Sequence, residues 1–409
     1  MLPRASIVPE GYRHSGPDLP ISPGLRCGKL FLVSGQFALE GEARGPGSGD
    51  LEQQAQIATD RVVAVLAAAG LEPGDLVQLR VFYVSRGDVD EAGLAEAIAG
   101  RIGRLNGPGP ALTMAPVEAL ALPGVLIEIE AIAMRGENGE ALPRAAAWDP
   151  SAMSPPPPFS HALRVGEMIF TSGVTAQGRN GGVAAKGNLL EQSRIVLSRL
   201  DGLLRQLGAD LQDVVKTNLF NAEPGTKDEW RAPALLRASH YREPGPCATG
   251  LSVRRLWPEG VMLKNDVVAM RGLDGSRLPR QHVWPRDHWD WTVHLPYRHG
   301  LRCGDLVFMG GQVPLSPKAA VMHEGDLMAQ TRMSMEYIGR ILTDLGLGFE
   351  NIVRVNSFYV GAASSETLAS HARECLSRFG TSRPAATLVT MPYLAYESML
   401  TEIDVIAMA

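Results

Sequence analysis

The chain has 409 residues, of which 20% are charged and 45% hydrophobic, and its formal net charge is -5. This composition is ordinary for a globular protein, and the length is greater than one compact core usually holds. The acidic balance argues against nucleic acid as a partner, and no apolar run approaches the roughly 20 residues that a membrane-spanning helix needs.

The first part of the chain contains one set of predicted elements. A run of apolar residues over 30–33 follows a glycine turn and predicts a buried strand. Between Ala55 and Ala69 the apolar residues recur every three or four positions, which predicts a helix with one buried stripe that ends at Gly70. Three further elements complete the set: a strand over 79–84, a weaker helix over 91–102 and a last strand over 126–134.

The same set of elements then recurs twice. The segment KLFLVSGQ at 29–36 returns as EMIFTSGV at 167–174 and as DLVFMGGQ at 305–312, with an offset of 138 residues both times. Such a register across many positions indicates three tandem copies of one unit. The predicted division is repeat 1 (1–136), a linker (137–158), repeat 2 (159–272), a second linker (273–290) and repeat 3 (291–409).

Each repeat is rich in strands and has two helices, which cover one face of its sheet. The other face is apolar and must be buried, and the two other copies on the same chain supply a surface for it. We therefore expect an α+β fold. The first linker ends in SPPPP and predicts a stiff spacer, whereas the second carries tryptophans and histidines and is expected to pack against the body.

The cysteines and the N-terminal segment bear on location. The N-terminal residues lack the apolar stretch of a secretory signal. Cys27, Cys247, Cys303 and Cys375 show neither paired spacing nor a C-x-x-C motif. That pattern predicts free thiols in a reducing compartment, so we expect a cytoplasmic protein.

Repeat 1 has SGQ after its first strand, a helix that closes in AAG-L, and P-x-x-T followed by a last strand with E-I-E-A-I-A, and the other repeats carry variants of this pattern. Together they resemble the Rid family, the YjgF-like reactive intermediate deaminases. The resemblance covers most of the chain. It implies three chorismate-mutase-like domains in a single-chain pseudo-trimer, with a central β-barrel, outer helices and a ligand cleft at each of the three interfaces. We expect a monomer or a dimer of pseudo-trimers.

The resemblance also implies an arginine in a P-A-R-T segment that clamps the carboxylate of the substrate. A guanidinium group suits this task because its N–H groups match both carboxylate oxygens. The corresponding residues here are Leu112, Ala248 and Ala386, so all three copies lack the clamp. The common 2-imino-acid chemistry of the family is therefore not expected.

The family's glutamate on the last strand corresponds to Glu128 in repeat 1 and Glu402 in repeat 3. A carboxyl group in an apolar cleft tends to have a raised pKa and can transfer protons, whereas the alternative is an ion-paired or solvated glutamate. Repeat 2 has Lys264 at this position. The lysine is a candidate Schiff-base amine or anion-binding charge, or else an ion-pair partner of Asp266 or of a glutamate in a neighbouring copy.

Further candidate contacts come from the same resemblance. The family's tyrosine ahead of the first strand is Tyr297, with His294 nearby as a possible acid or base. The serine of the S-G pair is Ser34 in repeat 1 and Ser172 in repeat 2, and Thr387 belongs to the P-A-A-T segment of repeat 3. Neither a helical H-x-x-x-H motif nor a Cys/His pair supports a metal, and we expect no cofactor.

Two classes of function remain open. The first is an enzyme that acts on a small polar metabolite by hydrolysis, deamination, or a lyase or cyclisation step. It would use one cleft, with Glu402 as the proton-transfer group, Tyr297 and a histidine as orienting groups, and Trp289 and Trp291 as walls. The second is a non-catalytic small-molecule-binding or regulatory protein. Ribonuclease activity is disfavoured by the acidic balance, and the sequence does not name a substrate.

We predict that the protein does not hydrolyse generic 2-imino acids, such as those that dehydratases release from serine or threonine. Leu112, Ala248 and Ala386 offer no charged donor for the carboxylate of such a substrate. A coupled deaminase assay beside an arginine-bearing relative measures this, and comparable rates for the two proteins would contradict the prediction.

Overall fold

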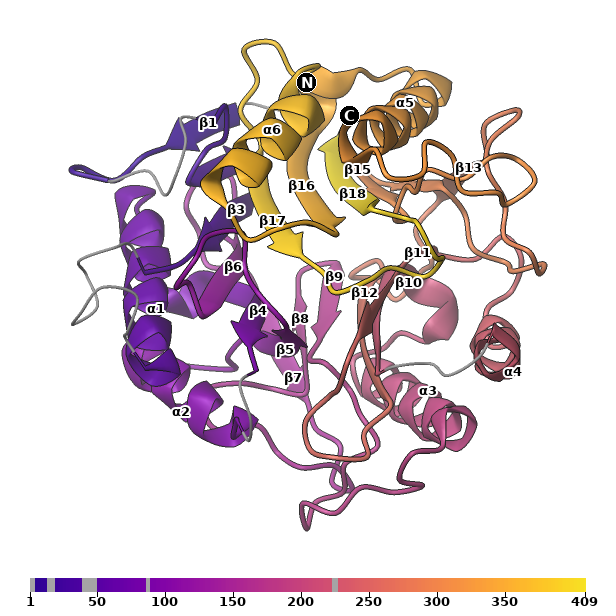
Figure 1. Ribbon diagram of the computed structural model, residues 1–409. Coiled ribbons are helices and arrows are strands. Elements are labelled where there is room, and N and C mark those ends of the chain that lie inside the picture. Colours follow the sequence, from indigo (N-terminus) through magenta and orange to yellow (C-terminus); the bar gives the residue numbers. More distant parts are fainter. Residues whose placement is uncertain (1–3, 13–18, 39–49, 86–88, 223–226) are drawn as a thin grey trace.

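The computed structural model describes the chain apart from five stretches. These are residues 1–3, 13–18, 39–49, 86–88 and 223–226. In the described residues the strands form three six-stranded sheets, one for each repeat, and two α-helices accompany each sheet. Figure 1 shows the sheets around a common centre with the helices outside. The predicted α+β fold and its threefold repetition are confirmed.

The three sheets share one topology. Repeat 1 has the strand order β1-β2-β3-β6-β4-β5. Its elements are β1 (Arg4–Ile7), β2 (Gly24–Cys27), β3 (Leu30–Gln36), α1 (Leu51–Ala68), β4 (Leu76–Val84), α2 (Glu91–Ile102), β5 (Ala111–Val117) and β6 (Ile127–Met134). In this sheet β4 and β5 are parallel and the other neighbours are antiparallel.

Repeats 2 and 3 follow the same plan, with the orders β7-β8-β9-β12-β10-β11 and β13-β14-β15-β18-β16-β17. The elements of repeat 2 are β7 (Arg144–Ala147), β8 (Ala162–Val165), β9 (Met168–Thr171), α3 (Leu189–Gln206), β10 (Val214–Ala222), α4 (Lys227–Ala238), β11 (Cys247–Val253) and β12 (Leu263–Met270). Those of repeat 3 are β13 (Arg280–Val283), β14 (Gly300–Cys303), β15 (Leu306–Met309), α5 (Leu327–Asp344), β16 (Ile352–Tyr359), α6 (Ser365–Leu376), β17 (Ala385–Thr390) and β18 (Thr401–Met408).

The long helix of each repeat has a side-chain cap at its start and the predicted glycine after its end. Its N-cap is an Asp or Asn whose side chain accepts a hydrogen bond from a backbone N–H of the first turn. These caps are Asp50, Asn188 and Asp326. Just beyond the helix lies a glycine with positive φ, which a residue with a Cβ rarely adopts. The three glycines are Gly70, Gly208 and Gly346.

Each sheet also has an edge strand that the sequence pattern did not reveal. β7 lies within 137–158 and β13 within 273–290, the two segments expected to be linkers, and they pair with β8 and β14. An arginine of each edge strand donates to a backbone carbonyl of the neighbouring repeat. These pairs are Arg4 with Asn351, Arg144 with Leu76 and Arg280 with Gln212. Most of each linker is therefore structural.

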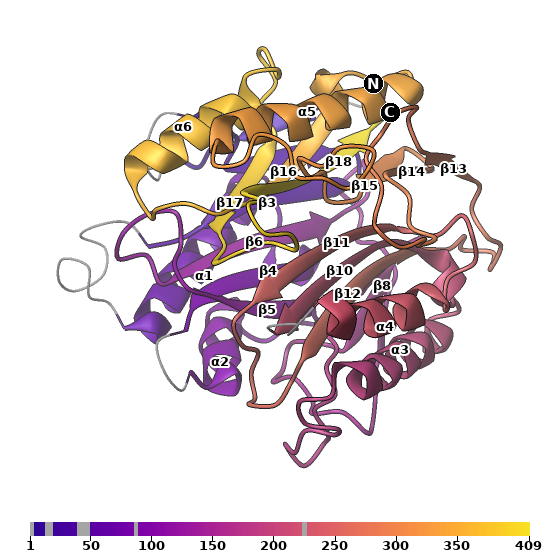
Figure 2. The same cartoon turned by 45° about the vertical axis from the view of Figure 1, so that its right-hand side comes forward.

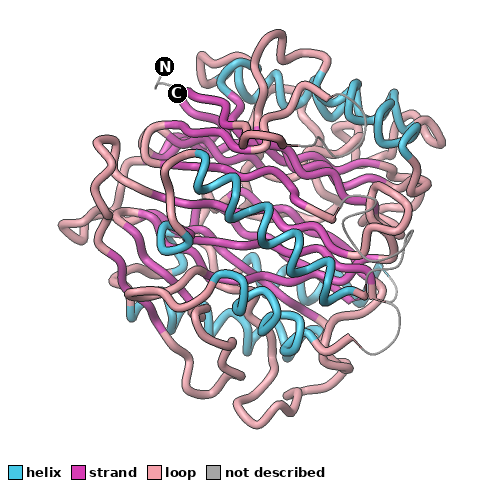
Figure 3. Tube along the Cα trace, turned by 90° about the vertical axis from the view of Figure 1, so that its left-hand side faces the viewer, coloured by secondary structure: helices cyan, strands magenta, loops and turns pink. Residues whose placement is uncertain are grey.

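The inner faces of the three sheets share one hydrophobic core. Leu32 of β3, Phe170 of β9 and Phe308 of β15 are buried together there. The outer faces pack against the helices in separate clusters, one for each repeat. Figures 2 and 3 show the helices along the outside of the strands from two further directions. This arrangement leaves the seams between repeats as the places where polar groups gather.

Three buried ion pairs join the repeats near the centre. Arg80 of repeat 1 lies 3.2 Å from Asp266 of repeat 2 (Nη2 to Oδ1). Lys216 of repeat 2 lies 3.1 Å from Asp404 of repeat 3 (Nζ to Oδ2), and Arg354 of repeat 3 lies 3.6 Å from Glu130 of repeat 1 (Nη1 to Oε1). Each base therefore pairs with an acid of the next repeat. We call these six residues the inter-repeat ion-pair ring.

We predict that breaking the ring destabilises the protein. Lys216→Met leaves Asp404 buried without its cation, which typically costs about 3–5 kcal/mol. Arg194→Met, which removes an exposed pair with Glu191, costs at most about 1 kcal/mol. Urea unfolding measures both, and the double variant Lys216→Met with Asp404→Leu should recover most of the loss. Equal, small effects of the two single variants would contradict the prediction.

Candidate functional site

The seam between repeats 2 and 3 encloses a cavity of about 110 Å³. Several elements contribute to its lining. Among them are β18 with Glu402, β10 with Asn221, α4 with Arg237, and the segment before β14 with Trp289, Trp291 and Tyr297. The structure therefore brings Glu402 and Tyr297, two of the predicted residues, to one cavity.

Glu402 is buried at the wall of this cavity, and its side chain lies against Gly311. A Cβ atom at Gly311 would lie only 1.9 Å from Oε1 of Glu402, so a larger residue at this position would displace the carboxyl group. Burial, and next the charge of Asp404, raise the pKa of Glu402 to about 8, although a hydrogen bond from the Gly250 backbone lowers it. At neutral pH the carboxyl group is therefore mainly protonated and is available as a proton donor.

Tyr297 is buried beside the same cavity. Its ring lies 6.0 Å from that of Tyr241 and 6.2 Å from that of Trp291. Burial raises the pKa of Tyr297, while the nearby charge of Arg237 lowers it. In the part of the chain that the structure describes, no residue forms a hydrogen bond with the hydroxyl group. Tyr297 thus offers the cavity a neutral hydroxyl group.

The predicted tryptophan wall is present. Trp289 is buried, and its Nε1 donates to Oε1 of Gln312 at 3.1 Å. Trp291 stacks on His299 with 5.5 Å between ring centroids. His288 donates to the same Gln312 oxygen at 2.8 Å, and burial lowers its pKa to about 4. The second linker is therefore held in place by an aromatic cluster with neutral histidines.

His294 does not line the cavity. Its side chain is 78% exposed, and Nε2 lies 3.1 Å from Glu243 at the surface. Burial, and next the charge of the neighbouring His288, lower the pKa of His299 well below its usual range, and Nε2 of His299 bonds the Trp289 backbone oxygen. The histidines of this region thus support the wall, and the structure places no histidine beside Glu402 in the described lining.

Two lining residues had not been singled out from the sequence, Arg237 and Asn221. Arg237 is 5% exposed, and its Nη1 donates to Oγ of Ser193 at 3.1 Å. Asn221 is equally buried, and its Oδ1 has no hydrogen-bond partner. A signal for Arg237 was present in the helix, since it follows Ala234 by three residues and therefore lies on the buried face of α4.

The seam between repeats 1 and 3 holds Glu128 in a smaller cavity of about 50 Å³. Burial, and next the charge of Glu130, raise the pKa of Glu128 to about 8. The rest of the described lining is mainly apolar and includes Leu368 and Leu388, and it has no basic side chain. The described lining of this cleft therefore has a proton donor and, apart from it, no charged group that could orient a substrate.

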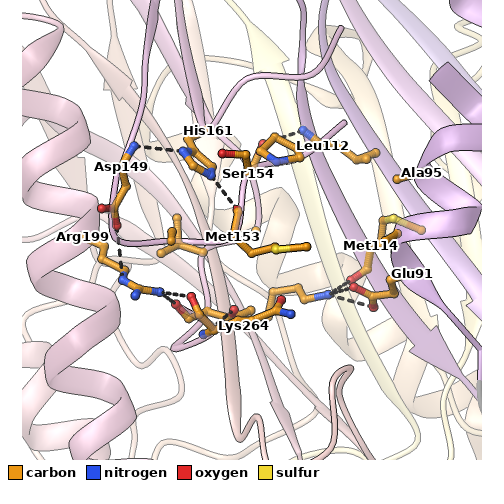
Figure 4. A pocket seen from close by; sticks show the side chains of 18 of the residues that line it. Glu91, Ala95, Leu112, Met114, Asp149, Met153, Ser154, His161, Arg199 and Lys264 are labelled. Carbon is orange, nitrogen blue, oxygen red and sulfur yellow. Dashed lines mark hydrogen bonds and ion pairs between the residues drawn. The ribbon is translucent and has the colours of Figure 1, made fainter. Parts of the chain in front are cut away.

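The seam between repeats 1 and 2 encloses about 140 Å³, and Figure 4 shows its charged groups paired with one another. Lys264 lies 2.7 Å from Oε2 of Glu91 and donates to the Met114 backbone oxygen at the same distance. Arg199 lies 3.2 Å from Asp149. The amine of Lys264 is thus held by a glutamate of the neighbouring copy, and Asp266, the other partner considered, belongs to the ion-pair ring.

The remaining predicted contacts connect repeats. Ser34 donates to the Ser22 backbone oxygen and accepts from the Ala386 N–H at 2.9 Å. Ser172 plays the same part in the next seam, where it accepts from the Leu112 N–H at 2.9 Å. Repeat 3 has a glycine at the corresponding position, so the seam that contains Glu402 lacks this hydroxyl clamp.

Thr387 faces the centre of the molecule and not a cleft. Its hydroxyl group donates to Oε2 of Glu130 at 2.6 Å, inside the ion-pair ring.

Among the described residues no group of three or more potential ligands is placed to hold a metal ion.

Comparison with known proteins agrees with this architecture. Residues 16–135, 150–262 and 292–409 match the sequence profile of the family described as Endoribonuclease L-PSP. The chain belongs to this family. It is the family to which the Rid motifs of the three repeats pointed, and the three matches correspond to the three repeats.

Individual members of the family align with one repeat at a time. A RutC family protein of Pyrococcus horikoshii is 30% identical over 116 residues, which are 27% of this chain and 86% of the relative. The 2-iminobutanoate/2-iminopropanoate deaminase of Escherichia coli is 34% identical over 117 residues, which are 28% of this chain and 88% of the relative. Each relative thus corresponds to a single Rid unit.

One solved structure resembles the whole pseudo-trimer. It is a chorismatase, which is 14% identical and aligns with a TM-score of 0.57 over 92% of this chain and 99% of its own. At this identity the likeness concerns the fold. A fold similar to that of the whole three-repeat chain therefore occurs in another single chain.

We predict that the two buried glutamates make stability fall as pH rises. Because the folded pKa of about 8 exceeds the usual value near 4.5, the folded state holds a proton that unfolding releases between these pH values. Glu128→Gln removes this loss of stability with rising pH. In the variant, the free energy of unfolding at pH 8.5 minus that at pH 5 should therefore exceed the same difference in the unmodified protein by at least about 1.4 kcal/mol, the equivalent of one pKa unit. Urea unfolding at both pH values measures the difference.

The control is Glu191→Gln, because Glu191 is a half-exposed glutamate on α3. It should leave the pH dependence unchanged. If Glu128→Gln and Glu191→Gln behave alike, Glu128 is ionised in the folded protein and the prediction fails.

Proposed function

We propose that this Rid-family protein is an enzyme that acts on a small polar metabolite in the cleft between repeats 2 and 3. The observation that carries the proposal is the buried carboxyl group of Glu402, whose raised pKa keeps it protonated beside a cavity with further polar groups. A protonated carboxyl group in such a setting suits general acid catalysis. The reaction class that fits is hydrolysis, deamination, or a lyase or cyclisation step.

In a hydrolytic or deaminating reaction the roles are as follows. Glu402 donates its proton to the leaving atom as the bond to that atom breaks, and water supplies the hydroxyl group. The resulting carboxylate then takes a proton from this water, which restores the acid. Tyr297 orients the substrate or the water, and Trp289 and Trp291 limit the access of solvent, which strengthens each polar interaction inside the cavity.

The other two seams support this choice of cleft. Between repeats 1 and 2 the charged groups of the described lining are paired with one another, and between repeats 1 and 3 the described lining is mainly apolar. Relatives that are enzymes by name give further support: an iminobutanoate deaminase for the single unit and a chorismatase for the three-unit chain.

The alternative is a non-catalytic small-molecule-binding or regulatory protein. The absence of the family's arginine at Leu112, Ala248 and Ala386 favours it. A thermal-shift screen of metabolites finds ligands under either proposal, since binding to the folded state raises its apparent stability. Turnover of the hits then separates an enzyme from a binding protein.

We further propose a cytoplasmic location, for which the four buried free cysteines give support. In the described part of the chain, none of the helices has the length and hydropathy to cross a bilayer. The proposed oligomeric state is a monomer or a dimer of pseudo-trimers, since the three fused repeats already occupy the positions of three subunits. Nucleic acid is not an expected partner.

We predict that Glu402→Gln lowers kcat/KM by about 10²–10⁴-fold for any substrate from the screen, because the amide cannot donate a proton as the acid does. In the unmodified protein kcat/KM should fall as pH rises through about 8, where Glu402 loses its proton. Glu128→Gln is the matched control, because it removes a carboxyl group of the same pKa from another seam. Loss of activity in Glu128→Gln together with a silent Glu402→Gln would place the reaction in the other cleft.

A further inference from the structure

Arg237 differs from the other buried basic side chains of the described residues. Four of them lie within 4.0 Å of a carboxylate: Arg80, Lys216, Lys264 and Arg354. Arg237 is as deeply buried, yet in the described part of the chain it has no carboxylate partner, and its side chain donates to the neutral hydroxyl group of Ser193. Burial of an unpaired charge is costly, and an anion bound beside it would offset that cost.

The surroundings of Arg237 are those of a binding subsite. Arg237 lines the cavity of Glu402, and so does Asn221, whose buried Oδ1 has no partner. A guanidinium group binds both oxygens of a carboxylate, and a free amide oxygen accepts a hydrogen bond from a hydroxyl or amino group. Trp289 and Trp291 line the same cavity and add flat aromatic side chains to it.

Arg237 and Glu402 line the same cavity, and in the described part of the chain no ion pair joins them. A guanidinium group in contact with Glu402 would favour the ionised carboxylate and remove the proton donor. The cavity thus keeps a fixed cation and a neutral acid apart, as a substrate with an anionic end and a separate reacting atom requires.

The counterparts of Arg237 explain why it points inward. α2, α4 and α6 each have 12 residues, and the next-to-last is Arg101, Arg237 or Cys375. Arg101 is held at the surface by Asp60 of α1, 2.6 Å away. The residue of α3 at the position of Asp60 is Ser198, which is exposed and uncharged. Repeat 2 therefore lacks the surface carboxylate that would hold the arginine outside.

We propose that Arg237, together with Asn221, binds the carboxylate end of the substrate and replaces the strand arginine that all three repeats have lost. The inferred substrate class is a small carboxylate with a flat apolar body and a hydroxyl or amino group near the carboxylate. This inference deepens the proposed function and rests on it for the identity of the cleft. Its test measures binding alone and needs no turnover.

The experiment is isothermal titration with two pairs of probes of matched shape, acetate with acetamide and benzoate with benzamide. We expect at least one carboxylate to bind at least tenfold more tightly than its amide. Arg237→Met should abolish this preference and leave the weak binding of the amide unchanged. Arg101→Met, the matched control in repeat 1, should retain the preference.

A second variant keeps the arginine and changes its partner. Ser198→Asp recreates the surface pair of Arg101 with Asp60, so it should draw Arg237 outward and weaken carboxylate binding at least tenfold. Melting temperatures separate a binding role from a structural one. Without added anion, Arg237→Met should melt at the same temperature or higher, because it removes an unpaired buried charge, and a clear fall would show a structural role and overturn the proposal.

Equal binding of each carboxylate and its amide, or an unchanged preference in Arg237→Met, would likewise overturn the proposal. Glu402→Gln distinguishes the two levels of inference, since it should keep the preference for carboxylates. If it does so but also keeps full turnover, the subsite stands and the proposed acid catalysis fails. If Glu402 is needed for turnover while carboxylates show no preference, the catalysis stands and the subsite fails.

Discussion

The inter-repeat ion-pair ring is the constraint on which the rest of the molecule depends. Three apolar sheet faces can pack against one another in many relative positions, because the hydrophobic effect is not directional. Buried charges have no such freedom, because a charge that does not reach its partner loses its hydration energy and gains no ion pair to offset the loss. Arg80, Lys216 and Arg354 thus fix the register of each repeat against the next.

The ring also acts on the candidate site. Asp404 belongs to the ring and lies two residues beyond Glu402 on β18, so both side chains point to the same side of the strand. The charge of Asp404 is one of the causes of the raised pKa of Glu402. The ion pair between repeats 2 and 3 and the proposed acid, Glu402, therefore share one strand, and Asp404 helps to keep the neighbouring carboxyl group protonated.

Sequence patterns revealed what is periodic, and they missed what depends on contacts between distant residues. The repeat, the buried stripe of α1 and the glycines that end the long helices were predictable, because each depends only on the spacing of residues along the sequence. The edge strands were not, because RAAA and RQHV have only one fully buried residue each. The role of Arg237 depends on which residue α3 presents beside it, and the inward direction of Thr387 depends on Glu130 in another repeat.

Covalent fusion bears on Arg237, whose buried guanidinium group has no carboxylate partner among the described residues. In a symmetric assembly of identical subunits, one substitution appears at every interface, so any strain that it introduces is multiplied by the number of subunits. In this chain Arg237 stands in one seam, while the Lys264–Glu91 pair and the Ser34 and Ser172 hydrogen bonds join the repeats at the other two. Fusion therefore lets one seam contain a buried guanidinium group whose cost is not repeated at the other two.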